Sequence, residues 1–87
     1  MKVLKKATAG TMESSDAYIE IEPCDDVEIE LSSVVKAQFG DSIIETVKSV
    51  LSECGVTGAR VKISDRGALD CVLRARVETA CLRGKEQ

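Results

Sequence analysis

The side chains that could do chemistry in this 87-residue chain are its serines, its carboxylates and four cysteines, because it contains no histidine. Nucleophile systems of the Ser-His-Asp or Cys-His kind need an imidazole as general base, so the chain cannot build one alone. Cys24, Cys54, Cys71 and Cys81 form no Cys-x-x-Cys motif, and the commonest zinc partner is missing. We therefore expect free structural thiols, no metal site and no catalytic residue, which favours a binding or carrier module over an enzyme.

Two serines compete as candidate modification sites. Ser14 follows Glu13 in a run of small and polar residues, which predicts an exposed turn before the first strand. Ser42 lies between Asp41 and Ile43, which looks like the Asp-Ser-Leu signature of the all-helical phosphopantetheine carriers, but it falls inside a predicted helix. A serine that receives a phosphodiester needs exposure and a deformable backbone, so Ser14 is the better candidate. Serine clusters of this kind are nevertheless more often plain turns or caps.

Alternating apolar and polar residues predict three strands. They cover residues 17–22, 27–31 and 59–63. Turn-forming residues at 23–26 predict that the first two strands form a hairpin with glutamates on its outer face. Arg60 and Lys62 on the outer face of the third strand would complement those glutamates in a neighbouring strand. Residues 1–15 lack alternation, and we expect them to form a flexible N-terminal arm that bears Ser14 and supplies few core side chains.

Helical periodicity follows the second and third predicted strands. One apolar stripe contains Val35, Phe39, Ile43, Val47, Val50 and Cys54, and the other contains Leu69, Val72, Leu73, Val77, Ala80 and Cys81. Gly55 is placed to end the first helix in the left-handed conformation. The order β-β-α-β-α predicts an α+β fold with a small three-stranded sheet and two helices packed on one face. Residues 16–87 would form this single domain, since a chain of this length has room for one core.

The charge pattern argues against nucleic acid and membranes as partners. The formal net charge is −3, with 12 basic residues scattered among 15 acidic ones, so no basic face is predicted. No apolar run approaches the length of a bilayer-spanning helix, and the N-terminus lacks the apolar stretch of a signal peptide. We therefore expect a cytoplasmic protein.

Three blocks of the sequence carry a family resemblance. They are residues 9–16 (Ala-Gly-Thr-Met-Glu-Ser-Ser-Asp), 36–41 (Lys-Ala-Gln-Phe-Gly-Asp) and 65–78 (Asp-Arg-Gly-Ala-Leu-Asp-Cys-Val-Leu-Arg-Ala-Arg-Val-Glu). In this order they resemble the citrate lyase acyl carrier proteins, the gamma subunits of that enzyme. In that family the serine of the Glu-Ser pair carries 2'-(5''-phosphoribosyl)-3'-dephospho-CoA through a phosphodiester, which implies Ser14 as the cofactor attachment site here. Some members have Gly where this chain has Ser15, so this chain has a second hydroxyl beside the site.

The resemblance implies a non-catalytic acyl carrier subunit of citrate lyase. Its covalent cofactor would hold acetyl and citryl thioesters, while the alpha subunit exchanges acetate for citrate and the beta subunit releases oxaloacetate. A holo-carrier synthase would attach the cofactor. Arg66, Arg74 and Arg76 in the third block could hold its phosphates or dock the larger subunits, although pairing with neighbouring carboxylates is the commoner role of such residues. The alternative is a structural or adaptor subunit without a covalent cofactor.

Overall fold

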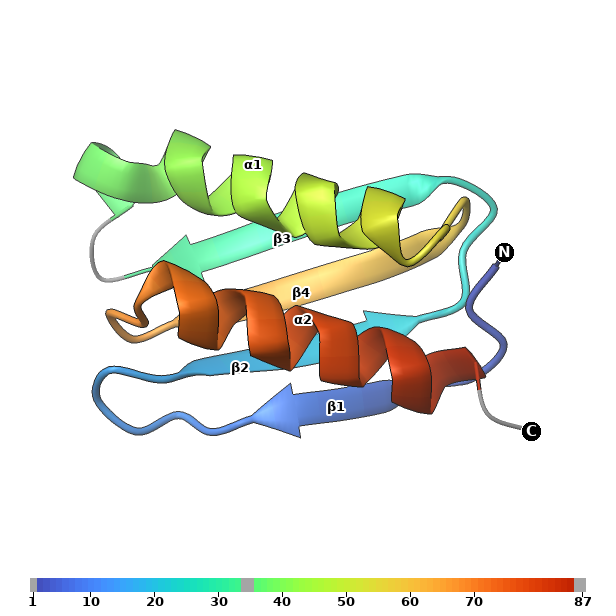
Figure 1. Cartoon of the computed structure of the whole chain (residues 1–87), viewed down its shortest axis with the longest axis horizontal. Coiled ribbons are helices and arrows are strands. Elements are labelled where there is room, and N and C mark those ends of the chain that lie inside the picture. Colours follow the sequence, from blue (N-terminus) through green and yellow to red (C-terminus); the bar gives the residue numbers. More distant parts are fainter. Residues whose placement is uncertain (1, 34–35, 86–87) are drawn as a thin grey trace.

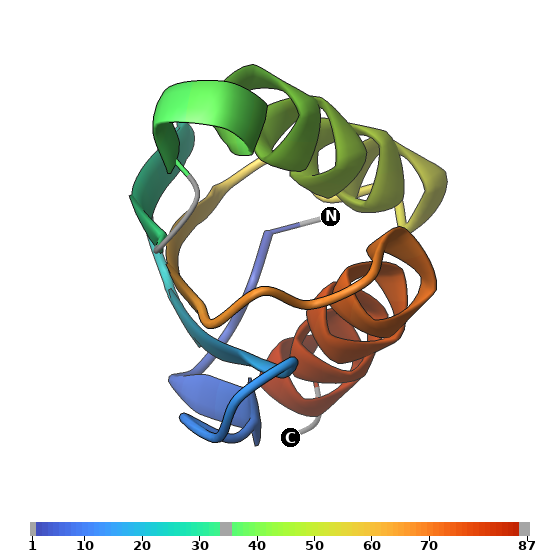
Figure 2. The same cartoon turned by 90° about the vertical axis from the view of Figure 1, so that its left-hand side faces the viewer.

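A computed structural model describes residues 2–33 and 36–85 of the chain, with the backbone alone for residues 36–38. These ranges contain four strands and two helices (Figure 1). In chain order they are β1 (Ala7–Gly10), β2 (Ala17–Glu22), β3 (Val27–Ser33), α1 (Lys36–Glu53), β4 (Ala59–Asp65) and α2 (Asp70–Lys85). Both helices lie on one face of a single sheet (Figure 2), which confirms the predicted α+β class.

The strand order in the sheet is β1-β2-β4-β3. β4 lies between β2, which is antiparallel to it, and β3, which is parallel to it. Ile63 of β4 is therefore opposite both Ile19 and Leu31. The hairpin predicted between residues 17–22 and 27–31 is wrong, because the chain crosses over through α1 after β3 and then inserts β4 between the two strands. A parallel pair such as β3 and β4 requires a crossover of this kind.

β1 is the strand that the sequence pattern did not reveal. Residues Ala7–Gly10 pair antiparallel with β2, so the sheet has four strands and not the three predicted. The prediction failed because these residues are small and lack an alternation of large apolar side chains. Ala9 and Val3 are nevertheless only 3% and 2% exposed, and both join the core. Residues 7–10 therefore belong to the sheet and not to an arm outside it.

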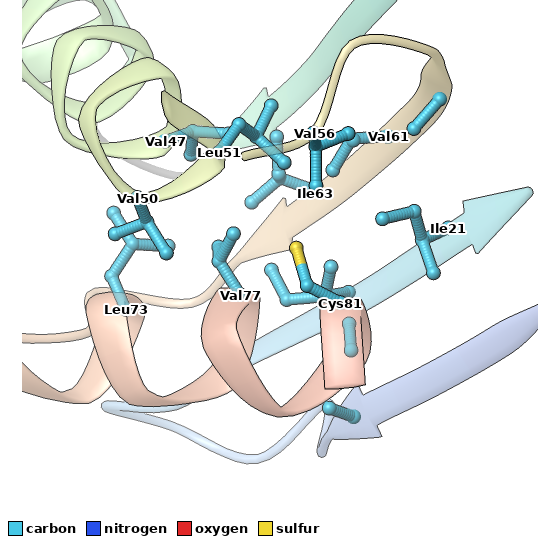
Figure 3. Packing of buried hydrophobic residues seen from close by; sticks show 14 of the residues in the cluster. Ile21, Val47, Val50, Leu51, Val56, Val61, Ile63, Leu73, Val77 and Cys81 are labelled. Carbon is cyan, nitrogen blue, oxygen red and sulfur yellow. The ribbon is translucent and has the colours of Figure 1, made fainter. Parts of the chain in front are cut away.

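The core fills the space between the sheet and the two helices (Figure 3). α2 packs over β1 and β2, α1 packs over β3, and the helices contact each other. Val47 of α1, Val77 of α2 and Val61 of β4 are fully buried, and burial of such a side chain is worth roughly 1.5–3 kcal/mol. Both helices contribute buried apolar side chains to this core, and neither helix in the described ranges is long and apolar enough to cross a bilayer.

The opposite face of the sheet is charged. The Arg60 guanidinium lies 3.3 Å from the carboxylate of Glu22 on β2 and 3.6 Å from that of Glu28 on β3. Lys62 is opposite Glu20 in the register of β2 and β4. The predicted charge complementarity between residues 59–63 and the neighbouring strands is confirmed.

Both helices depart from their predicted apolar stripes at the N-terminal end. In α1, Ile43 and the next two positions of the stripe are buried, but Phe39 is 54% exposed. Val35, the first position of that stripe, lies outside the described residues. Leu69, just before α2, is 69% exposed, whereas its stripe is buried from Leu73 onward. Two large apolar side chains predicted to pack in the core are therefore at the surface.

Gly55 ends α1 as predicted. Its φ is 72°, in the left-handed region. The Gly55 N–H donates to the Ser52 carbonyl at 3.0 Å, and the Val56 N–H donates to the Leu51 carbonyl at 2.9 Å. This pair of bonds is the Schellman motif, which satisfies carbonyls that the end of a helix leaves without partners.

Candidate functional site

Ser14 lies at the tip of the β1–β2 hairpin, within the connection formed by residues 11–16 (Figure 1). Its side chain is exposed, and no hydrogen bond from the described residues engages its hydroxyl. The sequence placed Ser14 on an exposed segment before the first strand, and the structure places it between two strands. The hydroxyl is open to another protein on a segment that the sheet anchors at both ends.

Backbone hydrogen bonds tie this connection to the segment between β4 and α2. The Ser15 N–H donates to the Arg66 carbonyl at 2.8 Å, and the Arg66 N–H donates to the Asp16 carbonyl at 2.9 Å. Ser15 has a φ of 66°, in the left-handed region that favours Gly. Glycine adopts this conformation without strain, so the backbone at Ser15 would also accommodate Gly. The backbone beside Ser14 is therefore held by its neighbours.

Asp16 anchors the hairpin to α2 through its side chain. The Arg76 guanidinium donates to both carboxylate oxygens, from Nε at 2.9 Å and from Nη2 at 3.2 Å. The Thr11 hydroxyl donates to Oδ2 at 2.7 Å, and the Ala17 N–H donates to Oδ1 at 2.8 Å. The Arg76 hydrogen bond, with smaller contributions from Thr11 and Ala17, holds the pKa of Asp16 well below its usual range. Asp16 and Arg76 are 60 residues apart, so no local sequence pattern revealed this support.

Asp16→Asn is expected to lower the free energy of unfolding at pH 7, and the loss should shrink as the pH falls. The pKa of Asp16 is lower in the folded chain than the ~3.9 of an unfolded chain, so the ionised carboxylate stabilises the fold above pH ~4. That contribution is lost as the pH falls through the folded-state pKa. Urea unfolding followed by circular dichroism at pH 7 and pH 2.5 measures both effects.

Asp26→Asn is the matched control for this measurement. Asp26 is exposed and lies in the connection between β2 and β3, which leaves the end of β2 opposite to the hairpin connection. Its replacement should change the stability by less than ~0.5 kcal/mol, as for most surface substitutions. A stability loss for Asp16→Asn that is the same at both pH values would show that the ionised pair with Arg76 does not stabilise the hairpin.

The three arginines of the third sequence block have different surroundings. Arg76 is held by Asp16, and Arg74 pairs with Glu53 of α1. Arg66 is exposed and forms no ion pair with any other described residue. Because its backbone is bonded to the hairpin connection, Arg66 is the arginine of the three that remains available to an anion near the hairpin tip.

Ser42 lies within α1, as the helical periodicity predicted. Its side chain is exposed, but the surrounding backbone is regular helix. It belongs to the wall of a groove that also contains Phe39 and Ile43. Ser42 thus lacks the irregular backbone that distinguishes the setting of Ser14.

The four cysteines are free thiols: Cys24, Cys54, Cys71 and Cys81. Cys81 is buried in the core (Figure 3), where burial, with the neighbouring Cys54, raises the pKa of its thiol to about 12. A protonated thiol is a poor nucleophile, so Cys81 is suited to packing and not to covalent chemistry. Among residues 2–33 and 36–85, no group of three or more cysteines and carboxylates lies close enough together to hold a metal ion.

The fold and the site together define a small α+β domain with an exposed serine at the tip of a hairpin. The family model described as "ACP: Malonate decarboxylase delta subunit (MdcD)" matches residues 4–84. Citrate lyase acyl carrier proteins from Haemophilus influenzae (strain PittEE) and Escherichia fergusonii are each 49% identical to this chain, with 100% of this chain and 92% of each relative covered. The chain belongs to this acyl carrier protein family, whose members are carriers and not enzymes.

A solved structure has the same fold. A chain in the crystal structure of a Pseudomonas malonate decarboxylase hetero-tetramer in complex with malonate matches with a TM-score of 0.68. The match covers 95% of this chain and 87% of that chain, at 20% sequence identity. At this identity the likeness shows the shared fold alone.

Proposed function

We propose that this chain is the acyl carrier subunit of citrate lyase and that Ser14 is the attachment site of its covalent prosthetic group. The names of relatives that are 49% identical over the whole chain support the first part. The observation that carries the second part is the exposed Ser14 hydroxyl at the tip of a hydrogen-bonded hairpin. This position makes the hydroxyl accessible and keeps its surroundings constant.

The residues around Ser14 fit a group linked through a phosphodiester. Phosphoryl transfer needs an attacking hydroxyl in line with the phosphate, and the exposed tip allows that approach. The Arg76 guanidinium compensates the negative charge of Asp16, which would otherwise oppose an incoming phosphate. The exposed Arg66 guanidinium can pair with a phosphate oxygen beside the tip.

The proposed group is 2'-(5''-phosphoribosyl)-3'-dephospho-CoA, which supplies a terminal thiol that holds acetyl and citryl groups as thioesters. The contribution of the chain itself is positional, because a tethered acyl group meets each partner's active site at a high effective concentration. The proposed partners are the alpha subunit for acyl exchange, the beta subunit for citrate cleavage and the holo-carrier synthase, all in the cytoplasm.

Intact-mass measurement tests this proposal. The chain purified as part of an active citrate lyase complex should be heavier than its sequence by the mass of the prosthetic group, and peptide fragmentation should place that mass on Ser14. Ser15 and Ser42 are the internal controls, and both should be unmodified. An unmodified chain in an active complex would favour the adaptor alternative. Added mass on Ser15 or Ser42 would show that this other serine, and not Ser14, is the attachment site.

A further inference from the structure

A groove opens between the first half of α1 and the beginning of α2, with a volume of about 350 Å³. Its walls are mainly apolar, with Phe39 and Ile43 from α1, Leu73 from α2, and Leu69 from the segment before α2. Phe39 and Leu69 are 54% and 69% exposed, so large apolar surfaces remain in contact with water at this place. A concave apolar surface of this kind is typical of a binding site.

The groove adjoins the connection that carries Ser14. Gly67 and Ala68 line the groove, and the residue before them, Arg66, exchanges two backbone hydrogen bonds with the hairpin connection. The hairpin tip, the segment between β4 and α2, and the beginning of α1 lie at the same end of the molecule (Figures 1 and 2). The segment between β4 and α2 therefore connects the hairpin tip to the groove.

The charged residues that line the groove are acidic and disfavour the binding of anions. No Lys or Arg is among the described residues that line it, whereas two carboxylates are, those of Asp65 and Asp70. Asp65 is buried and accepts hydrogen bonds from the Ser33 hydroxyl at 2.7 Å and the Ala68 N–H at 3.0 Å. Asp70 accepts one from the Thr46 hydroxyl at 2.6 Å. The described lining offers an anionic ligand like charges and apolar walls, and the exposed Arg66 lies outside it, so the groove suits a slender neutral ligand.

We infer that this groove holds the neutral pantetheine part of the arm attached at Ser14 while the terminal thiol is free or acetylated, and releases it when the thiol carries a citryl group. The inference rests on the function proposed for Ser14. Pantetheine combines a branched apolar segment with two uncharged amides, which matches the groove walls. A citryl group adds carboxylates, which an acidic and apolar groove disfavours. Tethering raises the effective concentration to about the millimolar range, so a weak interaction is enough to occupy the groove.

The size of the groove favours the tethered arm over a partner subunit as its occupant. Small-molecule sites are typically ~300–1,000 Å³, and this groove of about 350 Å³ lies within that range. A stable protein interface buries roughly 800 Å² on each partner, which is far more than two exposed apolar side chains supply. The groove also adjoins the connection that carries Ser14, so a group linked to Ser14 would be near it in every modified chain.

Backbone amide chemical shifts of the unmodified and the Ser14-modified chain test the inference. Iodoacetamide gives the arm thiol a neutral cap, and iodoacetate gives it a negatively charged cap of nearly the same size. We expect the amides of residues 39–46 and 67–73 to shift in the free-thiol and neutral-cap forms. Their shifts should be at least twofold smaller with the charged cap. The unmodified chain treated with each reagent corrects for alkylation of the chain's own cysteines.

Leu69→Ser and Leu82→Ser form a matched pair of variants. Leu69 and Leu82 are 69% and 47% exposed, so neither replacement creates a cavity in the core. Leu69 lines the groove, and Leu82 lies on α2 away from it. Leu69→Ser should abolish the shifts caused by the arm, and Leu82→Ser should retain them.

The outcomes separate this inference from the function on which it rests. A chain that carries the prosthetic group on Ser14, but whose groove amides match those of the unmodified chain, overturns the inference and leaves the proposed function intact. A chain without the group refutes the proposed function itself. Equal shifts for the two caps overturn the selection by charge. Groove shifts that occur only after a partner subunit is added overturn the inference, because they assign the groove to a protein interface.

Discussion

Ser14→Ala is expected to abolish attachment of the prosthetic group and to reduce citrate cleavage by the assembled complex to background. The substitution removes one exposed oxygen atom that has no hydrogen-bond partner among the described residues. The bonds that hold the connection come from the backbone of Ser15, Asp16 and Arg66, and they remain. The free energy of unfolding should therefore change by less than ~0.5 kcal/mol. Intact mass, lyase turnover and urea unfolding of the same preparation measure the three effects.

Two other serine substitutions are the controls. Ser42→Ala changes an exposed residue of α1 and should leave attachment and turnover unchanged. Ser15→Gly removes the neighbouring hydroxyl and should retain attachment. It also removes the strain of a non-glycine residue in the left-handed conformation, so it should stabilise the fold by up to ~1 kcal/mol. If Ser14→Ala kept full turnover while either control lost it, the assignment of Ser14 would be wrong.

The elements that the sequence predicted correctly are those whose apolar residues repeat with a clear period. Residues 17–22 and 59–63 alternate strictly and form β2 and the greater part of β4. The pairing of strands could not be predicted in the same way, because the period of a strand identifies its buried face and not its neighbour. Turn residues after Glu22 suggested a hairpin, but the longer crossover through α1 places β4 between β2 and β3.

The exposed positions of Phe39 and Leu69 show a second limit of periodicity. Both lie on a predicted apolar stripe, with Phe39 in the first turn of α1 and Leu69 just before α2, beyond the part of each stripe that is buried. Periodicity gives the direction of a side chain around the helix axis and not the extent of the surface that covers it. The groove that these residues form could therefore not be predicted from the sequence.

Only part of the candidate site could be predicted from the sequence. The exposure of Ser14 follows from small and polar neighbours, but the bonds of Asp16 to Arg76 connect residues that are 60 positions apart. The sequence favoured a flexible arm, whereas the structure holds the connection through β1, β2 and the segment between β4 and α2.

Gly10→Ala is expected to have the largest effect on stability of any single substitution near the site. Gly10 is the last residue of β1 and has a φ of 92°, which other residues rarely adopt. An added Cβ would overlap the carbonyl oxygen of Ala17 and lie 3.2 Å from Cδ of Arg76. Backbone strain and overpacking each cost roughly 1–3 kcal/mol, so we expect a loss of about 3 kcal/mol in urea unfolding. A loss of this size is a large part of the total stability of a small domain.

Gly67→Ala separates the overlap from the backbone strain. Gly67 has a similar φ of 89°, but an added Cβ there would have no other atom within 4 Å. Its replacement should cost about 1 kcal/mol, from strain alone. Since Gly10 joins β1 to the connection that carries Ser14, Gly10→Ala should also slow attachment of the prosthetic group, whereas Gly67→Ala should slow it less. Equal losses of stability for the two variants would mean that β1 can shift away from Ala17 and that the hairpin tip is held less firmly than its hydrogen bonds indicate.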